Sequence, residues 1–318
     1  MKISSKQCVF LLCNQTMKKF NLCVLFSLFL ISSVFAQTSS LDSLSTDTIP
    51  VMKNKFNSVY KIKPGVDIPI VAVGTIWSSY TFTKIYNKGQ SSTEKILSLR
   101  KEDINSFDRW AIYSYSKSMD KLSYYPFYAA IPLPLIYCLT SKDTRHDFFK
   151  ITFLYWEALS VTGLFGTSAT YFVDRYRPYA YDPNTDIEKR KGANAKNSFY
   201  SGHAQIVAAS TFFIAKVHAD YHPSSKSNWI YYGVAGVATG TTAYLRLRGG
   251  QHFPSDILLG TALGTLSGIL VPQFHKVKNP SLSVFPYMEE NKKGLTFIYQ
   301  FRATQAKESS QYINKVIL

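Results

Sequence analysis

The sequence predicts an all-α protein, a bundle of about six core helices followed by a short C-terminal β-hairpin. Two observations support this. Apolar segments long enough for helices alternate with polar connections, at roughly 66–83, 122–140, 148–173, 203–217, 229–245 and 254–272. After residue 279 the pattern changes to two β-prone runs on either side of the polar turn 289–294, as in a hairpin.

The helical segments are suited to a membrane, although a soluble bundle stays open as the alternative. A membrane span needs about 20 mostly apolar residues, and segments 148–173 and 254–272 come close. Segments 203–217 and 229–245 are shorter and rich in small residues, which allow close helix packing in either setting. We expect the bundle to be embedded in a membrane.

The first 36 residues predict export. Lys18 and Lys19 precede an apolar run, and small residues at Val34 and Ala36 fit a signal-peptidase site. An uncleaved anchor helix is the alternative. We therefore expect a signal peptide at 1–36, a Ser/Thr-rich linker at 37–60, a helical domain at 61–278 and a tail at 279–318. Only Cys138 would remain in the mature chain, which excludes a disulfide within it.

Charge narrows the class of partner. The net charge is +16 at pH 7, yet the chain has no long run of basic residues or basic arm, so nucleic-acid binding is not expected. The charge better suits anionic lipid head groups or phosphorylated substrates. The polar segment 91–122, between the first two apolar segments, looks like an amphipathic helix at the surface. No obligate protein partner is evident.

The segment 246–256 places polar and charged groups, which are costly to bury, between two apolar helices. Pro254 suits the first turn of a helix, so His252 lies just before that helix and Asp256 in its first turn. We expect Asp256 to accept a hydrogen bond from His252, which fixes the tautomer and raises the basicity of the other ring nitrogen. The alternative is that His252 is an ordinary polar residue at the start of the helix and that Asp256 caps this helix.

Two further segments carry related chemistry. Ser201, Gly202 and His203 begin another apolar helix, where backbone N–H groups form an anion site that Gly202 leaves accessible. Arg175 and Arg177 end the segment 148–173, and arginine offers a planar fork to phosphate oxygens. In an up-and-down bundle, these two segments and 246–256 all fall at the same end.

The three segments resemble the type 2 phosphatidic acid phosphatase superfamily, which includes bacterial nonspecific acid phosphatases and vanadium haloperoxidases. The superfamily pattern is Lys-x6-Arg-Pro, then Ser-Gly-His, then Arg-x5-His-x3-Asp. The chain carries Arg177-Pro178, Ser201-Gly202-His203 and Arg246-x5-His252-x3-Asp256, with Thr170 in place of the lysine. The resemblance covers about 150–275.

The resemblance implies a metal-independent phosphatase with a phosphohistidine intermediate and no cofactor. His252 would attack phosphorus, oriented by Asp256, and His203 would protonate the leaving group and later activate water. The phosphate oxygens would be held by Arg177, Arg246, Ser201 and Gly202. We expect Arg175 to supply the charge lost at Thr170. The four other histidines lie outside the motifs and suggest no metal-ligand cluster.

The substrate expected from this resemblance is a phosphate monoester or pyrophosphate of a membrane lipid. Phosphatidic acid, phosphatidylglycerophosphate, undecaprenyl pyrophosphate and lipid A are the types that relatives with six helices dephosphorylate. The alternatives are a soluble or peripheral periplasmic acid phosphatase and, further off, a haloperoxidase or a non-catalytic membrane protein with motif remnants.

We expect the protein in the bacterial cell envelope with its site facing the periplasm, although the predicted topology conflicts with this. A cleaved signal peptide followed by three spans would put Arg177 inside. Either an early segment such as 66–83 does not span, or the bundle does not span, or the site faces the cytoplasm.

Overall fold

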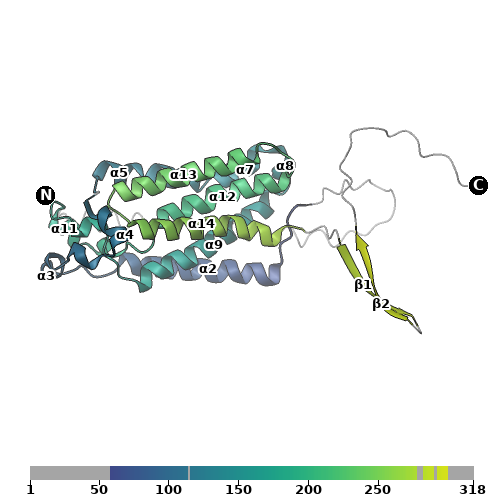
Figure 1. Cartoon of the computed structure of the whole chain (residues 1–318), viewed down its shortest axis with the longest axis horizontal. Coiled ribbons are helices and arrows are strands. Elements are labelled where there is room, and N and C mark those ends of the chain that lie inside the picture. Colours follow the sequence, from purple (N-terminus) through teal and green to yellow (C-terminus); the bar gives the residue numbers. More distant parts are fainter. Residues whose placement is uncertain (1–57, 114, 278–281, 290–291, 300–318) are drawn as a thin grey trace, which may run out of the picture.

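The structure, a computed structural model, describes residues 58–113, 115–277, 282–289 and 292–299. Long, roughly aligned helices form a bundle, and short helices gather at one end of it (Figure 1). The long helices are α2 (Pro64–Tyr86), α9 (Phe148–Phe172), α12 (Gly202–Tyr221), α13 (Asn228–Arg248) and α14 (Pro254–His275). The all-α class is therefore confirmed.

The second apolar segment, 122–140, is broken into shorter helices. They are α5 (Lys117–Leu122), α6 (Tyr124–Ala130) and α7 (Leu133–Thr140), and α8 (Lys142–Arg145) leads into α9. Pro126 and Pro132 lack the N–H that a continuous helix needs, so the interruption follows from the sequence. All six predicted segments are helical, the second in pieces.

The segment 91–122 differs from the single amphipathic helix that its sequence predicts. It forms α3 (Thr93–Leu97), the 3-10 turn η1 (Lys101–Asp103), α4 (Ser106–Arg109), the 3-10 turn η2 (Trp110–Tyr113) and α5. The side chains of Ser92, Asn105 and Ser116 each accept a backbone N–H three residues ahead and begin a new short helix. Frequent N-caps therefore divide this region.

Helix α12 lies at the centre of the bundle, between α13 and α14, and α2 packs along α9. The contact of α12 with α14 depends on glycines one helical turn apart. A Cβ atom added at Gly260, Gly264 or Gly268 would lie 2.1–2.6 Å from a backbone oxygen of Ser201, Gln205 or Ala209. The two backbones touch, so α14 holds the start of α12 in a fixed place.

The outer surface of the bundle is strongly apolar. Large apolar side chains exposed on the long helices include Val66, Val73, Ile76, Phe165, Phe172, Trp229, Val234, Val237, Leu258, Leu266 and Phe274. Within the described part of the chain, Lys117–Thr140 and Pro254–His275 are long and apolar enough to cross a bilayer. Core helices of soluble proteins can meet the same two criteria.

The tail contains the predicted hairpin. Strands β1 (Leu282–Glu289) and β2 (Lys292–Tyr299) pair antiparallel, with Glu289 opposite Lys292. The predicted signal peptide lies outside the described residues, as does the predicted linker 37–60 apart from its last three residues.

Candidate active site

The three motif segments meet at the end of the bundle where the short helices gather. After α9, the chain runs alongside residues 195–198, at the end of η3 (Ala193–Lys196) and just after it. The Arg177 N–H donates to Ala195 O (2.7 Å), and the Ser198 N–H donates to Arg175 O (3.0 Å). The Ser201 N–H donates to Asp256 O (3.1 Å), joining the start of α12 to the start of α14. The predicted convergence at one end is therefore present.

His252 is 2% exposed and has one defined tautomer. Its Nδ1 lies 2.7 Å from the Ser198 carbonyl oxygen, which can only accept, so Nδ1 carries the proton. Its Nε2 lies 3.3 Å from Nη2 of Arg246, which can only donate, so Nε2 presents its lone pair. The imidazole is therefore held as a neutral ring with its lone pair on Nε2.

The electrostatic surroundings keep this imidazole neutral. Burial is the main cause that holds the pKa of His252 well below its ordinary value, followed by the positive charges of Arg177 and Arg246. The Ser198 carbonyl opposes the shift without cancelling it. A histidine with a low pKa keeps its lone pair at neutral pH, as a nucleophile requires.

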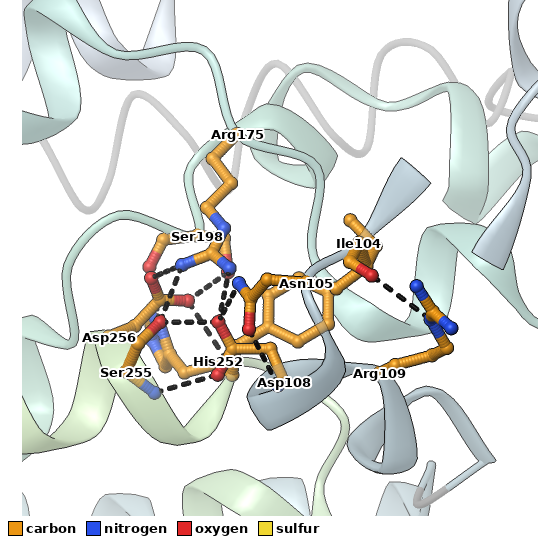
Figure 2. A network of polar contacts seen from close by, with 10 residues as sticks. Ile104, Asn105, Asp108, Arg109, Arg175, Ser198, His252, Ser255 and Asp256 are labelled. Atoms are coloured by element: carbon orange, nitrogen blue, oxygen red, sulfur yellow. Dashed lines mark hydrogen bonds and ion pairs between the residues drawn. The ribbon is translucent and has the colours of Figure 1, made fainter. Parts of the chain in front are cut away.

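The predicted hydrogen bond from His252 to Asp256 is wrong. Asp256 is fully buried, and its carboxylate accepts from Ser198 Oγ (2.6 Å), from the Phe253 N–H (2.9 Å) and from Arg175. Ser198 contacts both residues, Asp256 through its hydroxyl and His252 through its carbonyl (Figure 2). The Ser198 carbonyl is the partner of the imidazole, so Asp256 acts on His252 indirectly, through Ser198 and through the backbone N–H of Phe253.

Arg175 is predicted to supply positive charge to the phosphate site, but its contacts in the structure are with other residues. Its guanidinium pairs with Asp256 and Asp108 (2.7 Å to Oδ2) and donates to Ser255 Oγ (2.9 Å) (Figure 2). Burial raises the pKa of Asp108, but hydrogen bonds from Ser255, Asn105 and Arg175 outweigh burial and leave the pKa below its ordinary value. Arg175 therefore neutralises two carboxylates.

The position of the absent motif lysine is surrounded by other polar groups. Thr170 Oγ1 donates to Gly166 O one turn earlier (3.0 Å), so its hydroxyl is used within α9. Lys88 brings an ammonium group to the Thr170 carbonyl (2.7 Å) and pairs with Asp174 (2.6 Å). A lysine is therefore near this position, although the contacts it makes here are to Thr170 and Asp174.

Two other arginines lie close to the imidazole. Arg246 is 1% exposed and donates through Nη1 to Asp120 (3.0 Å) and Ser123 (3.1 Å). Arg177 donates to Gln251 Oε1 and to Asn194 Oδ1 (3.2 Å). Each guanidinium acts electrostatically on the other and on both His203 and His252. These four groups therefore share one site.

The start of α12 supplies the remaining predicted residues. Ser201 is its buried N-cap residue, and Gly202 is exposed with no atom within 4 Å of the place a Cβ would take. The ring of His203 packs against Phe127 (4.4 Å between centroids) and Tyr124 (4.8 Å) of α6. Those aromatic rings hold the imidazole at the N-terminus of α12.

Several buried polar atoms here lack a hydrogen-bond partner. Among the described residues they include Ser201 Oγ, His203 Nε2, Arg177 Nε and Arg246 Nε. Buried polar groups in native proteins are nearly always paired, so unpaired ones clustered at one place need an explanation. A ligand with several acceptor oxygens supplies one.

Sequence reasoning missed several residues that shape the site. They are Asp108, Asp120, Ser123, Asn194, Ser198 and Gln251, which contact the motif side chains. All lie outside the motif positions. The one available signal was proximity, because Ser198 and Gln251 are near Ser201 and His252 in the chain.

Together these features define a helical-bundle protein with a cationic site, rich in donors, at one end. Residues 151–280 match the family model of the PAP2 superfamily, which confirms the resemblance predicted from the three motifs. Similarity is also found to the crystal structure of a transmembrane PAP2-type phosphatidylglycerolphosphate phosphatase from Bacillus subtilis. The identity is 20%, the TM-score is 0.39, and the match covers 65% of this chain and 94% of that one. No curated protein matches significantly in sequence.

Proposed function

We propose that this protein is a phosphatase that cleaves phosphate esters through a phosphohistidine on His252. The observation that carries the proposal is the group of unpaired buried donors around a neutral imidazole whose Nε2 lone pair is available. Phosphate is the ligand that this set of donors suits, because its non-bridging oxygens accept from guanidinium, hydroxyl and backbone N–H groups.

The reaction needs two steps. In the first, Nε2 of His252 forms a bond to phosphorus while the bond from phosphorus to the ester oxygen breaks, and His203, protonated in the complex with the anionic phosphate, gives that oxygen a proton. In the second, His203 takes a proton from water, whose oxygen attacks the phosphohistidine and releases phosphate with His252 as the leaving group.

The arginines and the start of α12 would stabilise the charge that develops on phosphorus. Arg177, Arg246 and Ser201 each have one unpaired donor, and the Gly202 N–H is at a helix N-terminus without a side chain in the way. Arg246 also contacts Nε2 of His252 at 3.3 Å, so the donor already lies beside the attacking atom. Attack would exchange that contact for one to phosphate.

We propose further that the substrate is a membrane lipid phosphate or pyrophosphate. The support is the number of large apolar side chains exposed on the long helices, because extensive apolar exposure marks a membrane or protein interface. Aromatic rings at the site end, including Trp110, Tyr124, Tyr125 and Tyr128, suit the interface between lipid and water. A site among them could receive a head group while acyl chains stay in the bilayer.

The site is proposed to face the periplasm. This part of the proposal rests on the predicted signal peptide at 1–36 together with an early segment, such as 66–83, that does not span the membrane, and intact cells test it. A membrane-impermeant phosphorylated substrate should be hydrolysed by intact cells that express the protein. Hydrolysis that appears only after lysis would contradict a periplasmic site.

The deciding experiment compares lipid and soluble phosphates with wild type and His252→Ala in detergent. Wild type should release phosphate from a lipid phosphate at a rate at least tenfold above that from a soluble monoester. His252→Ala should lower release by about a thousandfold or more, as for removal of a catalytic nucleophile. His222→Ala, at the other end of α12, is the matched control and should keep full activity.

Equal rates on the two substrate classes would favour a nonspecific acid phosphatase. Unchanged activity in His252→Ala, or no activity in wild type on any substrate, would contradict the proposed mechanism.

A further inference from the structure

Three titratable side chains form a buried cluster at the other end of the bundle from His252. Asp67 comes from the first turn of α2, Glu157 from α9 and His275 from the last turn of α14. They are 2%, 4% and 7% exposed. One ligand atom of each lies within 4.8 Å of the other two. Helix α14 has 22 residues, so about 33 Å of helix separates this cluster from the phosphatase site.

The imidazole of His275 is oriented toward the two carboxylates. Its Nδ1 donates to the Val271 carbonyl (2.7 Å), so Nδ1 carries a proton. Its Nε2 lies 3.1 Å from Asp67 Oδ2 and 3.5 Å from Glu157 Oε2. A histidine held in this way by a backbone carbonyl has the arrangement typical of a metal ligand.

One carboxylate oxygen of the cluster lacks a hydrogen-bond partner. Glu157 Oε2 accepts no hydrogen bond, although it is buried and faces the cluster. Asp67 Oδ2, by contrast, accepts the Lys63 N–H at 2.5 Å. A buried carboxylate without a donor is costly, so some positive group should satisfy it.

Charge in the cluster is also unbalanced. Among the described residues, the ion pairs of Asp67 and Glu157 are with His275 alone. The neighbouring Lys216 and Lys276 both pair with Asp220. A proton on His275 would offset one of the two carboxylates, whereas a divalent cation would offset both.

We infer that Asp67, Glu157 and His275 bind a first-row divalent cation such as Zn²⁺ or Mn²⁺, which joins α2, α9 and α14. Ligand atoms about 2.0–2.2 Å from a tetrahedral zinc ion lie roughly 3.3–3.6 Å from one another. The two measured separations from Nε2, 3.1 and 3.5 Å, are close to that range. Two carboxylates and one imidazole suit zinc, manganese or ferrous iron. The site is structural and takes no part in phosphate chemistry.

The test uses the full chain, purified without an affinity tag and stripped of metal with EDTA. Zn²⁺ and Mn²⁺ are then added separately, unbound metal is removed, and bound metal is measured by mass spectrometry beside thermal unfolding. Wild type should retain one ion per chain. A cation at about a hundredfold excess over its Kd should raise Tm by roughly 5 °C or more. Glu157→Gln and His275→Gln should each lose the ion and the shift.

Two controls separate this cluster from other sites. His222→Gln removes one of two neighbouring histidines, His218 and His222, whose ring centroids lie 4.6 Å apart and which could bind zinc on their own. This variant should keep both the ion and the shift, as should His252→Ala from the phosphatase site.

Two outcomes would overturn the inference. If His222→Gln loses the ion while Glu157→Gln keeps it, the cation binds elsewhere. If wild type retains no ion and neither metal changes Tm, the cluster is held together by protons alone. Neither outcome depends on phosphatase activity.

Discussion

Ser198 connects His252 to Asp256 through two different atoms. Its carbonyl accepts from His252, and its hydroxyl donates to Asp256. The backbone contact sets the tautomer of the imidazole, while the side-chain contact fixes the loop that carries the carbonyl. The orientation of the imidazole by the carbonyl and the anchoring of the loop by the hydroxyl can therefore be tested separately.

Ser198→Ala should lower kcat by about tenfold without a comparable change in KM, because the loop carrying the carbonyl loses its anchor on Asp256. Ser255→Ala is the matched control, since Ser255 Oγ donates to Asp108 at 2.6 Å and does not touch Ser198. Each variant should lose about 1–2 kcal/mol of unfolding free energy, as expected for a hydrogen bond to a carboxylate. Steady-state kinetics and thermal unfolding measure both effects. Equal kcat values for the two variants would contradict the role of Ser198.

Arg175→Ala should act mainly on stability. Removing the guanidinium leaves two buried carboxylates, Asp108 and Asp256, without their cation, which typically costs about 3–5 kcal/mol. KM for the phosphate substrate should stay within about twofold of wild type, because Arg175 does not belong to the group with unpaired donors. A large rise in KM with unchanged Tm would instead place Arg175 on the phosphate.

The low pKa of His252 predicts the direction of a pH effect on stability. Below its ordinary pKa of about 6.5, the unfolded chain binds a proton at this residue while the folded chain does not. Stability therefore falls as the pH drops from about 6.5 toward the folded pKa, and it is unaffected by this group above 6.5. Replacing His252 with Gln should reduce the loss of Tm between pH 7 and about 5. Parallel Tm profiles for the two proteins would contradict the assignment.

At the residue scale, the sequence predicted which side chains meet but not all of their contacts. Motif spacing located the segments, and helix ends brought them to one place. The partner of His252 depends on the path of residues 194–200, which no spacing rule defines. Asp67, Glu157 and His275 are far apart in the sequence and lie in three different helices, so no local pattern marked them.

At the scale of elements, the close contact between α12 and α14 determines how His203 on α12 lies relative to Asp256 on α14. Gly264→Ala would bring a Cβ to 2.1 Å from Gln205 O, so one helix must shift. We expect a loss of about 2 kcal/mol or more, together with lower kcat, because α14 carries Asp256 and α12 carries His203. Gly236→Ala on α13, where a Cβ meets nothing within 4 Å, should be neutral or slightly stabilising. Similar Tm values for the two variants would contradict close packing at Gly264.

The long helices could be predicted because each contains an apolar run of helical length. The short helices of residues 91–122 did not, because local N-caps such as Ser92 and Asn105 interrupt the pattern. This region nevertheless supplies Asp108 and Asp120 to the site. It contributes through tertiary contacts, which a helical period cannot reveal.

At the scale of the whole molecule, the apolar exterior predicts how the protein fractionates. After alkaline carbonate extraction, the protein should stay in the membrane pellet, and detergent should release it. The reason is that burying the exposed side chains of α2, α13 and α14 in lipid removes large apolar areas from water. Immunoblots of the two fractions measure this. Release by carbonate alone would favour a peripheral enzyme.

The acceptor that orients His252 belongs to the main chain. Every amino acid at position 198 would offer the same oxygen, so no point substitution there can delete it. Ser198→Ala therefore acts on the tautomer only indirectly, through the loop that carries this oxygen. An ester in place of the 198–199 amide, which weakens the carbonyl as an acceptor and keeps every side chain, would test it directly.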